Sequence, residues 1–123
     1  METEFYKNLK LFLKDLVVLF PDEDENIQTI TTGINLAIVD DENLEIIRKF
    51  YNAMSPLQSF IATRDNAIFN NCRQFWESGS YEQRLFIRIN ENWALFTPSE
   101  QDTLWKYIEY LYKLSKIIIE KFK

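Results

Sequence analysis

The stretch TPSEQDTLWKYIEYLYKLSKIIIEKF, residues 97–122, carries the clearest structural signal in this sequence. Thr97 stands where a helix N-cap accepts hydrogen bonds, Pro98 suits the first helical position, and Glu100 can reach back to the amide of the cap. No glycine or further proline follows within the stretch. We therefore expect one long helix from this capping box to about Phe122.

Apolar side chains cover most of the circumference of this expected helix. Its polar residues recur every three or four positions and so form a single stripe: Lys106, Glu109, Lys113, Lys116, Glu120 and Lys123. A helix with one narrow polar stripe must be covered on most of its sides. It is therefore either the central helix of a bundle or one half of an interface.

The rest of the chain also shows helical patterns. Apolar residues recur at spacings of three and four in residues 3–20, 27–38 and 44–54, and shorter helices are expected at 56–61, 65–69 and 81–89. Ser80 and Gln83 fit a second capping box. Gly33 costs about 1 kcal/mol inside a helix, so we expect a neighbouring helix to approach closely there. The sequence predicts a single all-α domain over residues 1–123, a compact multi-helix bundle of about five to seven helices around the long C-terminal helix.

The amino-acid composition excludes most known kinds of catalytic site. The chain has no histidine, one cysteine and two glycines, which excludes histidine-based triads and zinc sites and leaves no glycine-rich phosphate loop. Carboxylate pairs could still act as acid and base, and the candidates are Asp22, Asp24, Asp40 and Asp41. Each lies in an expected turn or helix start, where an acid has an ordinary electrostatic role. We expect no enzyme activity, no cofactor and no metal site.

Cys72 is the remaining reactive candidate, since a thiol with a lowered pKa and an exposed position would be nucleophilic. A buried, unreactive cysteine is the simpler interpretation. With one cysteine no disulfide can form within the chain, and the N-terminal segment has too many charges for a secretory signal or a membrane span. We expect a cytoplasmic or nuclear protein that does not insert into membranes.

Charge is distributed unevenly along the chain. The net charge is −5, with 11 acidic residues against 3 lysines in residues 1–45 and 5 lysines against 2 glutamates in residues 103–123. Lys106, Lys113 and Lys116, close to tyrosines of the same helix, raise the alternative of a nucleic-acid-associated factor. The acidic balance of the whole chain argues against it, and a solvated lysine stripe over buried aromatics is the competing interpretation.

Aromatic residues favour a protein partner. Tryptophan and tyrosine are enriched at interface hot spots, although core packing would account for most of them here. Our interface candidates are Trp76, Trp93 and a stripe at seven-residue spacing formed by Trp105, Tyr112 and Ile119. We expect a protein partner of unknown identity, and a homodimer is an alternative.

Two segments of the chain have a distinctive pattern. The first is residues 5–21, with Phe5-Tyr6-Lys7-Asn8-Leu9, residues 12–16 and Phe20-Pro21, and the second is residues 104–112, with Leu104-Trp105-Lys106-Tyr107 and the tyrosines that follow. Both segments resemble small uncharacterised helical proteins of nucleocytoplasmic large DNA viruses. The resemblance covers about a third of the chain. It implies a viral accessory or virion-associated protein that acts inside the host cell or in the particle. With the residues above, it leads us to expect a non-enzymatic protein-interaction module.

Overall fold

The computed structural model describes residues 2–39 and 44–121, and within these residues every regular element is helical. In these described residues seven α-helices follow one another, interrupted by four 3-10 turns. The α-helices are α1 (Glu2–Leu19), α2 (Asp24–Val39), α3 (Glu45–Met54), α4 (Gln58–Thr63), α5 (Ile68–Asn71), α6 (Tyr81–Asn92) and α7 (Pro98–Lys121), and the 3-10 turns are η1 (Pro21–Glu23), η2 (Ser55–Leu57), η3 (Cys72–Phe75) and η4 (Trp93–Leu95). The predicted all-α bundle around a long C-terminal helix is confirmed.

The long helix α7 begins as its sequence predicts. The Thr97 amide donates to Oε1 of Glu100 at 2.8 Å, and the Glu100 amide donates to Oγ1 of Thr97 at 3.1 Å. These reciprocal bonds satisfy two of the amides that a helix start leaves unpaired. The helix is described to Lys121, so its predicted end at Phe122 lies outside the described residues, as do Asp40 and Asp41.

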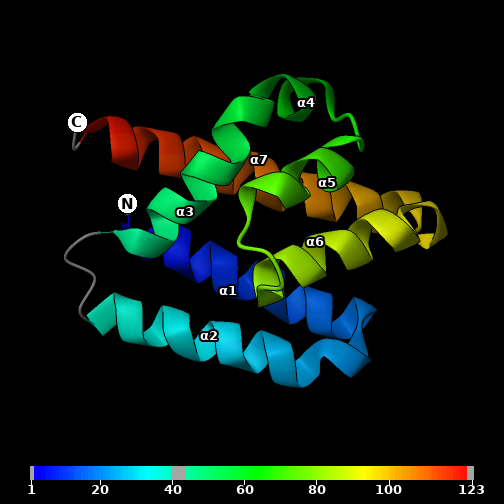
Figure 1. Cartoon of the computed structure of the whole chain (residues 1–123), viewed down its shortest axis with the longest axis horizontal. Coiled ribbons are helices and arrows are strands. Elements are labelled where there is room, and N and C mark those ends of the chain that lie inside the picture. Colours follow the sequence, from blue (N-terminus) through cyan, green and yellow to red (C-terminus); the bar gives the residue numbers. More distant parts are fainter. Residues whose placement is uncertain (1, 40–43, 122–123) are drawn as a thin grey trace.

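Other helices of the chain cover α7 on most sides. Figure 1 shows α1 running alongside it in the opposite direction, with α3 crossing near its C-terminal half. The buried residues of α7 are Leu104, Trp105, Ile108, Leu111, Leu114, Ser115, Ile118 and Ile119. Tyr107 lies over Phe12 of α1 with ring centroids 5.4 Å apart and donates its hydroxyl to Asp15 at 2.8 Å. The helix is thus the centre of the bundle, the first of the two predicted alternatives.

An aromatic cluster joins the second half of the chain to α7. The Phe69 ring lies 4.7 Å from the Trp93 ring and 5.5 Å from the Trp105 ring, and Trp93 meets Trp105 edge to face at 5.9 Å. Phe86 of α6 stacks on Trp76 at 5.5 Å. Aromatic pairs of this geometry add to the free energy gained by burial alone, so the cluster fixes α5, α6 and α7 against one another.

A group of ion pairs ties η1 to α6. The side chain of Glu23 is fully buried, and it accepts hydrogen bonds from Arg84 Nε at 2.9 Å, Arg88 Nη1 at 2.8 Å and Asn26 Nδ2 at 2.7 Å. Arg88 also binds Asp22 at 2.7 Å and lies 4.7 Å above the Phe20 ring. A carboxylate can be buried only when its charge is compensated in this way. Asp22, a catalytic candidate on sequence grounds, therefore has a structural role here.

These ion pairs predict a loss of stability in acid. Burial alone would raise the pKa of Glu23, but the hydrogen bonds from Asn26 and Arg84, together with Arg88, outweigh it and hold that pKa below its ordinary value of 4.5. The Arg88 hydrogen bond likewise lowers the pKa of Asp22 below 3.8. A carboxyl group whose pKa is lowered by folding stabilises the fold above its unfolded pKa, and this contribution is lost as pH falls through the folded value.

We therefore expect the melting temperature to fall as pH drops below about 4.5, and to fall less in a Glu23→Gln variant, which has no charge to lose at that position. Thermal unfolding followed by circular dichroism between about pH 7 and pH 3 gives the slope of melting temperature against pH for each of the two proteins. Equal slopes for the two proteins would show that Glu23 does not contribute to the acid sensitivity.

Candidate binding groove

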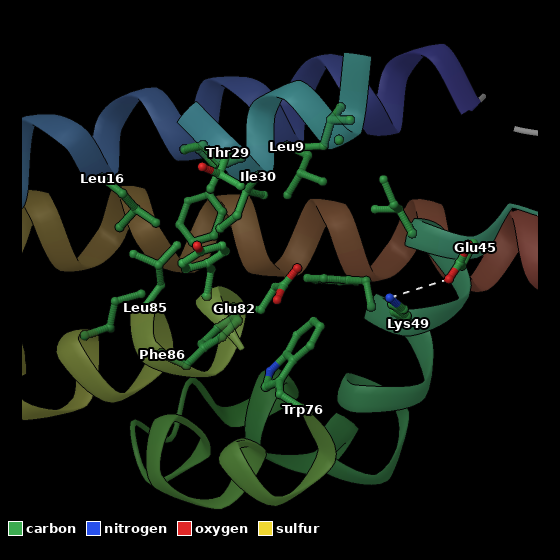
Figure 2. A pocket seen from close by; sticks show the side chains of 18 residues that line it. Leu9, Leu16, Thr29, Ile30, Glu45, Lys49, Trp76, Glu82, Leu85 and Phe86 are labelled. Atoms are coloured by element: carbon green, nitrogen blue, oxygen red, sulfur yellow. Dashed lines mark ion pairs between the residues drawn. The ribbon is translucent and has the colours of Figure 1, made fainter. Parts of the chain in front are cut away.

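A groove with a volume of about 340 Å³ opens between α1, α2, α3 and α6. Helices α1 and α2 line one side of the groove and α3 and α6 line the other, with Trp76 between α3 and α6 at the mouth (Figure 2). Its apolar lining consists of Leu9, Phe12, Leu13, Leu16, Ile30, Ile34, Ile46, Phe50, Leu85, Phe86 and Ile89. Small-molecule sites in proteins start at about 300 Å³ and have this apolar character, so the groove is large enough to accept apolar groups from outside.

Gly33 lies in the α2 wall of this groove. A Cβ atom added at Gly33 would have no heavy atom within 4 Å beyond its own helix. Our expectation of a close helix approach at this glycine was therefore wrong. Glycine weakens a helix by about 1 kcal/mol relative to alanine, and here the missing side chain leaves additional open space in the groove.

Polar side chains are confined to the edge of the groove. Figure 2 shows the Glu82 carboxylate directed into the opening, beside Trp76. Glu82 makes no hydrogen bond or ion pair with the residues that the structure describes. Across the opening, Lys49 Nζ lies 3.5 Å from Oε1 of Glu45. The mouth thus contains a half-buried carboxylate that has no cation of its own.

A second hollow adjoins the first across Trp76 and Glu82. It has a volume of about 210 Å³, and besides these two residues Lys49, Phe75 and Glu77 line it. Phe75 is 41% exposed. The hollowed surface therefore extends past Trp76, where its lining becomes more polar.

The structure separates the predicted interface residues into two groups. Trp105 and Ile119 are only 4% and 6% exposed, so both lie in the core of the chain and offer no surface to a partner in this fold. Trp93 belongs to the aromatic cluster, and Tyr112 stacks on Tyr51 at 6.2 Å. The seven-residue stripe on α7 is thus covered by the chain itself, while Trp76 borders an open groove.

The lysines of the nucleic-acid alternative lie on the exposed stripe of α7. Lys106 pairs with Asp102 at 3.1 Å, whereas Lys113 and Lys116 are exposed. The neighbouring tyrosines have partners inside the chain, since Tyr107 donates to Asp15 and Tyr112 to Gln58 at 3.3 Å. Of the tyrosines in the described part of α7, Tyr110 is the most exposed, at 40%, and its ring is the one open to base stacking.

Cys72 is fully buried. Burial raises the pKa of its thiol to about 12, although the neighbouring Trp76 side chain acts in the opposite direction. Thiolate is the reactive form, so this cysteine is unreactive in the folded protein at neutral pH, as the simpler interpretation of the sequence predicts.

The described residues contain no group of three or more histidine, cysteine, aspartate or glutamate side chains placed to hold a metal ion. Among the same residues, no helix combines the length and the apolar character needed to cross a lipid bilayer.

Sequence reasoning identified only part of this site. It selected Trp76, but neither Glu82 nor the groove itself, and it assigned Gly33 to close packing. Helical periodicity shows which face of a helix points inward, yet it does not show where two inward faces fail to meet. Gly33 marked this position because glycine is unfavourable inside a helix, but the sequence does not show whether a close neighbour or an open space lies beside it.

No protein-family model matches this chain, and no curated protein or solved structure matches it either. The resemblance of its two segments to proteins of large DNA viruses therefore stays a prediction.

Proposed function

We propose that this protein is a non-enzymatic protein-interaction module whose groove between α1, α2, α3 and α6 takes up apolar side chains of a partner helix. The observation that supports this most strongly is the open apolar groove, with Gly33 in its wall and Trp76 at its mouth. An apolar surface left open to water is unfavourable by roughly 25 cal/mol per Å². A partner that covers it would recover that free energy.

The form of the groove supports a helix as the occupant. Its walls are helices whose side chains project into one trough (Figure 2), and amphipathic helices bind such troughs through residues spaced three and four apart. Trp76 is half-buried at the edge of the groove, and tryptophan is one of the residue types enriched among interface hot spots.

The finer assignment is a viral accessory or virion-associated protein that acts in the cytoplasm or nucleus of a host cell. It rests on the resemblance of residues 5–21 and 104–112 to proteins of large DNA viruses. The nucleic-acid alternative has less support, because the tyrosines next to its lysines are used inside the fold.

Filling the groove from Gly33 tests the proposal. A Gly33→Leu side chain would enter open space, so we expect it to raise stability by about 0.5–2 kcal/mol, as cavity-filling substitutions commonly do. The same variant should bind the neutral fluorophore N-phenyl-1-naphthylamine at least about tenfold more weakly than the wild type, a difference of about 1.4 kcal/mol. Fluorescence titration and thermal unfolding give the two values.

Thr32→Leu is the matched control, because it adds a leucine to the exposed surface of the same helix outside this groove. It should leave binding of the fluorophore unchanged. Since the Gly33→Leu variant should be more stable, a loss of binding cannot come from unfolding. Wild-type protein that does not bind the fluorophore, or binds it equally well with leucine at position 33, would refute the groove as a binding site.

A further inference from the structure

The mouth of the groove differs from its interior in charge. Glu45, Glu77 and Glu82 line the two adjoining hollows, and among the described residues Lys49 is the single basic residue that lines them. Three acids against one lysine leave two negative charges at the opening. The interior, by contrast, contributes leucine, isoleucine and phenylalanine side chains.

We propose that the partner helix carries a lysine or arginine beside its apolar face, and that this cation lies between Glu82 and the aromatic side chains at the mouth. The inference rests on the proposed function and adds the chemistry of the partner. The apolar side chains would fill the trough, and the basic residue would fix the direction and register of the helix.

Glu82 is the residue that we expect to contribute most to binding of the partner's cation. Its carboxylate is directed into the opening and has no cationic partner among the described residues (Figure 2). It is half-buried, and a charge is screened less in such a position than on an open surface. A cation on the partner would therefore form a more favourable ion pair with Glu82 than with an exposed acid.

Aromatic side chains line the same two hollows. Phe75 and Tyr81 are 41% and 45% exposed, and Trp76 lies between the two hollows. Ammonium and guanidinium groups are attracted to the faces of aromatic rings within about 6 Å. Carboxylate and aromatic groups together favour a cation with an apolar stem, which describes the side chains of lysine and arginine.

Lys49 opposes such a cation. It stands at the edge of both hollows and pairs with Glu45 at 3.5 Å, with 60% of its own side chain exposed. Its replacement by glutamine would make the mouth more negative without changing the apolar walls. Affinity for a basic helix should then increase, a change that partial unfolding cannot produce.

Two synthetic amphipathic helices of about 18 residues, or five turns, provide the test. They share one leucine face, and their polar positions carry lysine in one peptide and glutamate in the other. Binding to the chain of residues 1–123 is measured by isothermal titration at low ionic strength, where Coulomb interactions are least screened. We expect the lysine peptide to bind the wild type at least about tenfold more tightly than the glutamate peptide.

The variants separate Glu82 from the overall negative charge. Glu82→Gln should lower the affinity for the lysine peptide about fivefold, which is at the upper end of the effects measured for partly exposed ion pairs. Glu91→Gln removes an exposed charge from the same helix α6 outside the groove and should change the affinity less than about twofold. Lys49→Gln should strengthen binding of the lysine peptide about twofold to threefold.

Equal losses in the Glu82 and Glu91 variants, no preference between the peptides, or no binding of the lysine peptide would each overturn the inference. The neutral fluorophore distinguishes this from a failure of the proposed function. If the Glu82 variant and the wild type still bind the fluorophore, the groove remains a binding site and only the basic partner is refuted. If neither protein binds it, the proposed function fails as well.

Discussion

Replacing Trp105 by alanine should lower the free energy of unfolding by about 3–5 kcal/mol, the range for removing a large aromatic side chain from a core. Trp105 is 4% exposed and contacts the rings of Phe69 and Trp93. Total stabilities of natural domains are about 5–15 kcal/mol, so this single substitution would remove a large part of the stability. Urea denaturation followed by circular dichroism gives the value.

The same experiment shows whether the Trp105 side chain belongs to the core of the chain or to an interface with a partner. Tyr110→Ala on the same helix is the control, since Tyr110 is 40% exposed, and it should change stability by no more than about 0.5 kcal/mol. If Trp105→Ala were as mild as this control, the indole would not be part of the core. The predicted interface stripe on α7 would then regain its support.

Replacing Arg88 by methionine should cost about 2–3 kcal/mol. Arg88 holds both Asp22 and the fully buried Glu23 and lies over the Phe20 ring. Removing one partner of a buried ion pair costs about 3–5 kcal/mol because it leaves a charge without compensation. The expected value is lower here, since Arg84 and Asn26 remain bonded to Glu23.

A double substitution shows whether the cost comes from the charge of Glu23. When Arg88→Met is combined with Glu23→Gln, the loss should be smaller than the sum of the two single losses by at least about 0.5 kcal/mol, as expected for residues in contact. Additive losses would mean that Arg88 contributes through its apolar stem and not through the carboxylate. Equilibrium unfolding of the four proteins at about pH 7 provides the comparison.

Local signals in this sequence predicted local structure well. The capping box at residues 97–100 forms as expected, and the Gln83 amide donates to Ser80 Oγ at 3.2 Å at the start of α6. At this second capping site the Gln83 side chain accepts a hydrogen bond from the amide of Gly79 at 2.9 Å, and not from the amide of the N-cap residue Ser80. Capping depends on residues only a few positions apart, so a sequence specifies it directly.

Long-range features could not be predicted in the same way. The apolar character of Trp105 and Ile119 is compatible with a core or an interface, and only the placement of the other helices decides between them. The link from Arg88 to Glu23 joins residues far apart in the sequence and leaves no periodic pattern. The groove depends on a gap between the walls formed by α2 and by α3 and α6, which no single helix encodes.

The measurement that tests the groove most directly is a titration of the ¹⁵N-labelled protein with N-phenyl-1-naphthylamine, followed by amide chemical shifts. We predict that the largest changes occur around the groove, at Gly33 in α2 and at Glu82 and Leu85 in α6, with the Trp76 indole also affected. Amides of Lys113 and Lys116, which lie outside the groove, should keep their positions. Changes concentrated on α7, or none at the groove residues, would contradict the proposed site.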